Sequence, residues 1–195
     1  LTRLFMRMMH ETNPFCSVEV FSHRGLSGDA SVDAPLLTET ALLSLAARGI
    51  HGFDVDLSFS SDGQLLIAHP AAVRQQLGAS VDVFSTSSAS IFAKSGARHA
   101  PMTALRLLTL VQRHNLTVML DLKGGISWPD HHASHLLHLA RYILSAKIED
   151  RVWLWVEDAG GVRNLRRGLR HAQSNATNQQ FMRLVVVKPV RDLGL

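Results

Sequence analysis

Paired acidic side chains are the first chemical feature of this sequence. Asp54 and Asp56 stand two residues apart in the apolar stretch 52–59, which has the composition of a β-strand. Residues two apart in a strand point to the same face of the sheet, so we expect the two carboxylates to be neighbours. Neighbouring carboxylates on a buried strand repel each other unless protons or a cation intervene. The spacing therefore predicts either a site for Mg²⁺ or Ca²⁺, which prefer oxygen ligands, or solvated acids on an exposed face.

A second predicted strand favours the metal site. Asp121 and Lys123 are again two residues apart, at the end of the apolar stretch 116–123. An acid and a base after such a run are costly to bury without partners. Asp121 thus supplies a third carboxylate that could hold the same cation.

Two histidines end further predicted strands. His23, followed by Arg24, ends the stretch 18–23, and His69 ends the stretch 64–69. Histidine is the side chain that exchanges protons near neutral pH, and arginine is a strong anion binder. One histidine at the end of a strand is more often structural, but two beside three carboxylates favour a reactive site.

The elements that must position these residues alternate between strand and helix, which predicts a parallel α/β architecture. In a (β/α) barrel the carboxyl ends of all strands open onto one mouth, where active sites lie. We predict a TIM-type barrel that is incomplete, with about six of eight strands, in preference to a small open sheet. Residues 1–17 are expected to be an N-terminal extension, and residues 18–195 a barrel domain truncated at its C-terminus. Strands are predicted over residues 18–23, 52–59, 64–69, 116–123, 151–157 and 182–188, and helices over 38–49, 104–115, about 130–147 and near 160–173.

Composition excludes several classes of protein. Of 195 residues, 46% are hydrophobic and 18% charged, which predicts one globular domain and not a disordered chain. No apolar run reaches the roughly 18 residues that a transmembrane helix needs. The net charge of +4 permits a phosphate-bearing partner. The arginines of residues 162–171 are expected to lie on a solvated helix face, and without a basic stripe interleaved with aromatic side chains we expect no nucleic-acid binding.

A histidine-rich stretch has a spacing that can also bind zinc. His131, His135 and His138 fall on one stripe of the predicted helix over 130–147. The apolar residues of that helix occupy the opposite arc, so we expect these histidines to face solvent. No acidic residue accompanies them as in zinc peptidases, and a zinc site is not expected.

The order of the motifs resembles the glycerophosphodiester phosphodiesterase family of phospholipase-C-like TIM barrels. The resemblance is carried by "HRG" (23–25), "APLLTETALLSLAARGI" (34–50), "GFDVDLSFSSDGQLLIAHP" (52–70) and "MLDLKG" (119–124). That family shows His-Arg-Gly, Pro-Glu-Asn-Thr, Glu-x-Asp, an Asp-Gly turn, a strand-ending His-Asp and Glu-x-Lys in the same order. The similarity spans about residues 20 to 125.

The resemblance implies a role for each candidate residue and a metal-dependent hydrolysis of a phosphodiester, most simply a glycerophosphodiester or a related lipid head group. His23 and His69 would be the acid–base pair, and Arg24 and Lys123 would bind the substrate phosphate. Asp54, Asp56 and Asp121 would hold one divalent cation, Mg²⁺ or Ca²⁺.

The sequence also departs from the family pattern. Aspartate replaces glutamate at Asp54 and Asp121, which withdraws each carboxylate by about 1.5 Å. Pro70 follows His69 where the family has aspartate. The chain also resembles the menorin-like proteins of the same barrel superfamily in "IAHP", "LDLK" and "RVWLWVED". That second resemblance implies, as the alternative, a non-catalytic barrel with an adhesion or binding role.

Overall fold

The computed structural model describes residues 5–7, 19–23, 37–124, 132–156 and 185–187. Arg24, His131 and the helix predicted near residues 160–173 lie outside these ranges. So does most of the predicted N-terminal extension.

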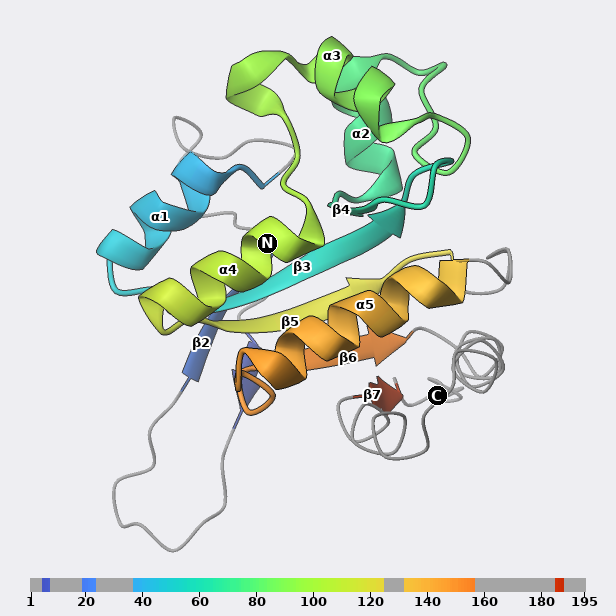
Figure 1. Ribbon diagram of the computed structural model, residues 1–195. Helices are drawn as coiled ribbons and strands as arrows, with labels where there is room; N and C mark the ends of the chain where they lie inside the picture. Colours follow the sequence, from blue (N-terminus) through green and yellow to red (C-terminus); the bar gives the residue numbers. More distant parts are fainter. Residues whose placement is uncertain (1–4, 8–18, 24–36, 125–131, 157–184, 188–195) are drawn as a thin grey trace, which may run out of the picture.

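A twisted sheet is the centre of the structure (Figure 1). Its strands follow the order β1-β2-β3-β5-β6-β7, and β2, β3, β5, β6 and β7 run parallel to one another. Parallel neighbours joined through helices are the arrangement of a (β/α) barrel, so the predicted α/β class is confirmed. The strands are β1 Phe5–Arg7, β2 Glu19–His23, β3 Gly52–Phe59, β4 Leu65–Ile67, β5 Thr117–Leu122, β6 Val152–Val156 and β7 Val185–Val187.

The strand predicted over residues 64–69 is not a member of the parallel set. β4 covers only Leu65–Ile67 and pairs antiparallel with β3, with Leu57 opposite Ile67. The intervening turn, Ser60–Gln64, is too short for the crossover that a parallel pair requires. His69 therefore follows a hairpin strand instead of ending a strand of the barrel.

Three helices cover one face of the sheet (Figure 1). These are α1 Glu39–Ala47, α4 Ala104–His114 and α5 His132–Ser145, all close to their predicted bounds. The N-cap of α1 is Thr38 and that of α4 is Thr103. The hydroxyl of each accepts a hydrogen bond from an amide of the first turn of its helix. None of the helices in the described part of the chain is long and apolar enough to cross a membrane.

A separate lobe lies beside β4, in a part of the chain for which no helix was predicted. It contains α2 Pro70–Leu77 and α3 Ser88–His99, with Ser87 as the N-cap of α3. The lobe has its own small core, which includes Val73, Val83 and Ile91. The sequence did not indicate these helices because the segment has few apolar residues and its serines are common in loops, although Ser87 supplies the cap of α3.

Strand β3 has one apolar face and one polar face, as the wall of a barrel requires. All eight residues of β3 are buried. Phe53, Val55 and Leu57 belong to the main apolar core under α1, α4 and α5. Asp54, Asp56 and Ser58 alternate with them and therefore point to the opposite face. That face carries the polar side chains.

Candidate active site

Strand register places four of the predicted site residues in two rows that cross adjacent strands. In the first row His23 of β2 pairs with Asp54 of β3, which pairs with Met119 of β5. In the second row Asp56 pairs with Asp121. Paired residues of parallel neighbours share a face of the sheet, so Asp56 and Asp121 are neighbours on the face that also carries Asp54.

Lys123 binds two of the three predicted carboxylates directly. Its Nζ lies 2.7 Å from Oδ2 of Asp121 and 3.2 Å from Oδ1 of Asp56. The backbone amide of Lys123 donates to the carbonyl of Leu57 at 2.9 Å, which extends the β3–β5 ladder one residue past the strand end. The Lys123 side chain is 12% exposed and that of Asp56 is 5% exposed, so both charges are largely shielded from water. Such a shielded ion pair is stable only while all its members are present.

The donors fit a divalent cation in chemical type. Asp54, Asp56 and Asp121 supply carboxylate oxygens from one face of two adjacent strands, and a single positive charge already bridges two of them. In the described ranges no group of three or more histidine, cysteine or acidic side chains is arranged so that it could hold a metal ion. Because the Lys123 ammonium lies between Asp56 and Asp121, a divalent ion bound by both would have to displace it. The metal site stays a prediction.

His69 reaches the same end of the sheet through the backbone. The amide of Ala68 donates to the carbonyl of Asp56 at 2.9 Å, and the hydroxyl of Ser58 donates to the carbonyl of Ala68 at 2.8 Å. These two bonds fix the residue before His69 against β3. Ser58, which is fully buried, was not predicted as part of the site. Its alternation with Asp54 and Asp56 could have indicated it.

His69 is also the N-cap of α2. Its Nδ1 accepts a hydrogen bond from the amide of Ala71 at 3.1 Å. Pro70 occupies the first helical position, where the missing amide hydrogen costs nothing. With Nδ1 as an acceptor, the neutral ring carries its proton on Nε2. The cap therefore fixes the tautomer of the neutral ring.

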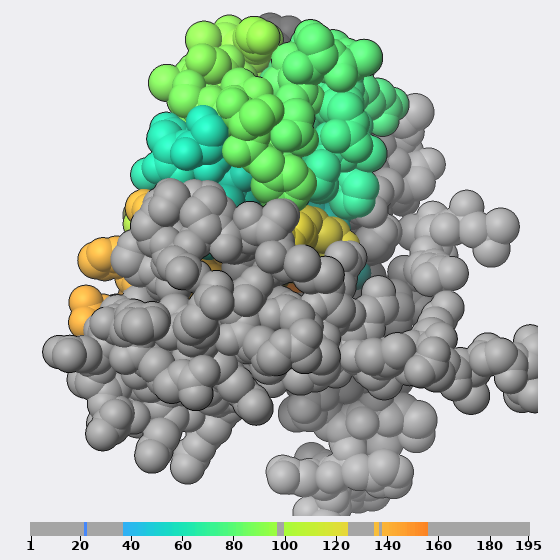
Figure 2. Space-filling view, turned by 90° about the vertical axis from the view of Figure 1, so that its right-hand side faces the viewer, coloured from blue at the N-terminus to red at the C-terminus, as the bar shows by residue number. Residues whose placement is uncertain are grey.

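Figure 2 views the structure from the side toward which β3, β5 and β6 point in Figure 1. The α2 and α3 lobe, in green, lies above the yellow atoms at the end of β5. The lobe begins after His69, which is the N-cap of α2. The lobe therefore lies at the carboxyl ends of the strands, as the candidate site does.

Two tryptophans line the polar face and were not predicted as site residues. Trp153 pairs with Met119, and Trp155 pairs with Asp121. Both are partly exposed, whereas the intervening Leu154 is buried in the apolar core. The alternation in "VWLWV" could have placed both indoles on the face that carries the acids.

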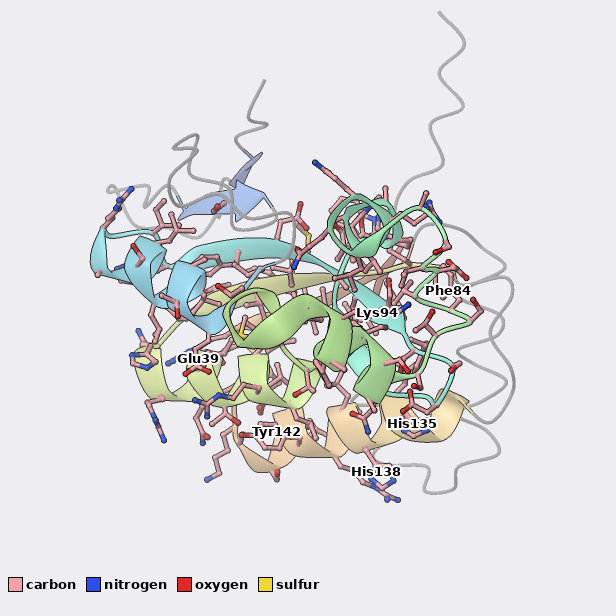
Figure 3. All side chains as sticks on the ribbon, turned by 90° about the horizontal axis from the view of Figure 1, so that it is seen from above. Glu39, Phe84, Lys94, His135, His138 and Tyr142 are labelled. Atoms are coloured by element: carbon pink, nitrogen blue, oxygen red, sulfur yellow. The ribbon has the colours of Figure 1, made fainter. Side chains whose placement is uncertain are left out.

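The histidine stripe of α5 differs from its prediction. His138 is exposed, but His135 is half-buried, with its ring 6.4 Å from that of Phe59 in an edge-to-face arrangement. Figure 3 shows His135 on the inner side of α5 and His138 farther out. The expectation that these histidines face solvent is therefore wrong for His135. Because β3 and its turn extend under α5, the ring packs there instead.

The sheet and its helices define a part of a (β/α) barrel, with charged side chains at the strand ends. A scan against family models finds no match for this sequence, and a search of curated proteins finds none. Solved structures do match the fold. One is a glycerophosphodiester phosphodiesterase from Agrobacterium tumefaciens, with 18% identity and a TM-score of 0.54 over 78% of this chain and 62% of that one.

Two further matches carry the same description. A protein from Galdieria sulphuraria has 18% identity and a TM-score of 0.59, over 75% of this chain and 59% of its own. A protein from Silicibacter pomeroyi has 16% identity and a TM-score of 0.56, over 75% of this chain and 60% of its own. The chain thus has the fold of the glycerophosphodiester phosphodiesterases, and it spans about 60% of the length of the structures it matches. This agrees with the predicted incomplete barrel.

Proposed function

We propose that this chain hydrolyses a phosphodiester, most simply a glycerophosphodiester or a related lipid head group. The observation that carries the proposal is the double row at the strand ends, where His23 pairs with Asp54, and Asp56 and Asp121 share the Lys123 ammonium. The fold shared with glycerophosphodiester phosphodiesterases supports the same substrate class.

Charge neutralisation would be the first task of this site. A phosphodiester carries one negative charge that repels an oxygen nucleophile. Lys123, at the end of β5, and Arg24, the residue after β2, are the cationic side chains we assign to the phosphate oxygens. Asp54, Asp56 and Asp121 would hold a divalent cation, which supplies Lewis-acid polarisation of the phosphoryl group when bound.

Proton transfer would be the second task. We assign it to His23 and His69, one taking a proton from the attacking hydroxyl and the other donating a proton to the leaving alcohol. Attack by a neighbouring hydroxyl of the substrate would give a cyclic phosphate, and attack by water would give the open monoester.

The direct test is hydrolysis of a panel of glycerophosphodiesters, with choline, ethanolamine and glycerol head groups, followed by ³¹P NMR in Mg²⁺ or Ca²⁺. The phosphorus spectrum distinguishes a cyclic product from an open one. We expect His23→Ala to lose turnover with little change in melting temperature. Full turnover in His23→Ala would remove that residue from the mechanism, and turnover unchanged by chelation of metal would remove the divalent ion.

A second candidate function is a non-catalytic barrel with an adhesion or binding role, as in the menorin-like proteins. The observation in its favour is that Lys123 neutralises Asp56 and Asp121 from within the chain. A folded protein that neither turns over the panel nor gains thermal stability from millimolar Mg²⁺ or Ca²⁺ would favour this candidate.

A further inference from the structure

A cavity of about 220 Å³ opens on the helix-covered side of the sheet. It lies between the turn that joins β3 to β4, the start of α4 and the N-terminal half of α5. Its floor consists of Leu65, Ala104 and Leu139, which belong to the main apolar core. Asp54 and Asp56 point to the opposite face of β3, so the cavity is built from other residues than the candidate active site.

Three polar side chains surround this floor, one from each of the three elements. Gln64 comes from the turn, Thr103 is the N-cap of α4, and His138 lies on α5. The Thr103 hydroxyl accepts from the amide of Arg106 at 3.2 Å, which leaves its own hydrogen to be donated. Within the described part of the chain, the Gln64 side-chain amide and the His138 imidazole make no hydrogen bond to another residue. All three groups can therefore donate to a molecule in the cavity.

The residues that line the cavity include two histidines and no acid. His135 and His138 lie near the same end of α5 (Figure 3). The ring of His135 lies against Gly63 and edge-to-face with Phe59, so it forms the inner wall. His138 is exposed and stands at the rim. An oxyanion in this cavity would meet hydrogen-bond donors and no lining carboxylate that repels it.

The volume and the apolar floor set the size of the ligand. An apolar cavity of about 150 Å³ accommodates benzene, so the 220 Å³ here can hold one ring with a small anionic group. Leu105, also at the rim, is 49% exposed and is the exposed large hydrophobic residue of the described chain. An apolar ring would cover this side chain and lie on the floor at the same time.

We propose that this cavity is a second binding site, which takes a small organic oxyanion: a carboxylate or a phosphate monoester on an apolar body about the size of one ring. The oxyanion accepts hydrogen bonds from Gln64, Thr103 and His138, and the apolar body lies between the floor and Leu105. Because the donors come from three elements, the ligand joins the turn after β3 to α4 and α5. The inference does not rest on the proposed function.

The first experiment measures binding by calorimetry with no phosphodiester present. Benzoate and phenyl phosphate are the probes, benzyl alcohol has the ring without the charge, and acetate has the charge without the ring. We expect both aromatic anions to bind, and benzyl alcohol and acetate to bind at least about tenfold more weakly. The tighter of the two aromatic anions then identifies which oxyanion the site prefers.

Variants of His138 locate the site. His138→Ala should weaken benzoate binding by about tenfold, the usual effect of losing a hydrogen bond to a charged group. His138→Gln keeps a donor, so it should weaken binding less. The matched control is His114→Ala, which removes another exposed histidine at the end of α4, outside the cavity, and should leave the affinity unchanged.

The second experiment uses the unmodified protein, so it does not depend on the folding of a variant. Benzoate is titrated into the ¹⁵N-labelled chain, and the shifts of the backbone amide signals are followed. We expect the largest shifts at Gly63, Leu105 and His138, which line the cavity, and little change in α2. Shifts that centre instead on Lys123 would place the anion at the strand ends and overturn the inference.

Two further outcomes would also overturn it. Equal affinity for benzoate and benzyl alcohol would show that the cavity does not select an anion. Failure of both aromatic anions to bind at millimolar concentration, or unchanged affinity in His138→Ala, would show that these residues form no such site. Each of these results leaves the proposed hydrolysis standing, and a failure of that hydrolysis leaves the binding result standing, because no diester is present in these measurements.

Discussion

His69 has two possible roles that the sequence alone does not distinguish. As a residue after an apolar stretch it indicates a reactive site, and as a residue before proline it indicates a helix start. The structure gives it the second role directly, through the bond from the Ala71 amide to Nδ1. The same bond leaves the proton of the neutral ring on Nε2. The cap thus fixes the tautomer of the neutral ring.

Substitution of His69 can separate these roles. His69→Ala should lower turnover of a glycerophosphodiester by about 10²–10⁴-fold, the usual contribution of a general acid. It should also cost about 1 kcal/mol in free energy of unfolding, because the N-cap of α2 is lost. His69→Asn keeps a cap but exchanges no proton, so its denaturation midpoint should recover while its turnover stays low. Restored turnover in His69→Asn would assign His69 to capping alone.

Gly63 shows a second constraint at the residue scale. Its φ is +78°, a conformation that glycine adopts readily, and a Cβ built there would lie 2.5 Å from Nε2 of His135. A side chain at position 63 would therefore require the His135 ring to shift and the turn to adopt a strained backbone conformation.

Gly63→Ala should lower the free energy of unfolding by about 1–3 kcal/mol, since strain in the left-handed region adds to the clash with His135. His135→Ala removes the clash but not the strain. The double variant should therefore be less destabilised than the sum of the two single variants, which denaturant unfolding of all four proteins can measure. Strict additivity would contradict the contact.

The sequence predicts which residues share a face of one strand, but it does not predict which residues pair across neighbouring strands. The spacing of Asp54 and Asp56 is enough to place both on one face. The pairing of Asp56 with Asp121 depends on the register of a parallel crossover, which no local pattern specifies. For the same reason Lys123 was predicted, from the family resemblance, as a phosphate ligand, and its pairing with two acids was not predicted.

At the scale of elements, the hairpin and the lobe of α2 and α3 show what local signals can decide. The stretch 52–59 was predicted with the bounds that β3 has, Gly52–Phe59, because its polar and apolar residues alternate. The antiparallel pairing of β4 could also have been predicted, since the Ser-Ser-Asp-Gly turn after β3 is too short for a crossover. The helices of the lobe could not have been predicted, because the apolar residues of this segment are few and its serines are common in loops.

Asp62 links this lobe to the hairpin through hydrogen bonds. Its Oδ1 accepts from the Ser60 hydroxyl at 2.5 Å and from the Ser88 amide at 2.9 Å, and its Oδ2 accepts from the Ser88 hydroxyl at 2.7 Å. Burial opposes ionisation, but these hydrogen bonds outweigh it and lower the pKa of Asp62 to about 2 from 3.8. The carboxylate thus joins the turn after β3 to the start of α3.

The stability of the lobe should therefore depend on pH. A carboxyl whose pKa is lower in the folded state stabilises the fold above its unfolded pKa and loses this effect as pH falls through the folded value. The unmodified chain should exceed Asp62→Asn in free energy of unfolding by about 1 kcal/mol near pH 6, a modest figure because Asp62 is exposed. The difference should shrink between pH 4 and about pH 2 in parallel urea titrations. A constant difference over this interval would show that the ionised form is not the one that fastens α3.

At the scale of the whole molecule, two apolar cores divide the described chain into unequal parts. The larger lies between the parallel strands and α1, α4 and α5, and includes Leu42, Leu108 and Leu120. The smaller lies under α2 and α3 and is joined to the barrel through β4, whose Leu66 is fully buried in it. A barrel wall with a smaller lobe at its strand ends can keep its site geometry while the lobe opens.

Hydrogen exchange can test whether the two cores open separately. Ile91→Ala and Leu108→Ala each truncate a fully buried side chain and should each cost about 2–5 kcal/mol in their own unit. Ile91→Ala should speed amide exchange throughout α2 and α3 and leave β3 and β5 protected, because only the small core loses contacts. Leu108→Ala should speed exchange in β3 and β5 and in the lobe as well, since the lobe loses its support when the barrel opens. If Ile91→Ala instead exposed β3 and β5 to the same degree, the described chain would be a single cooperative unit.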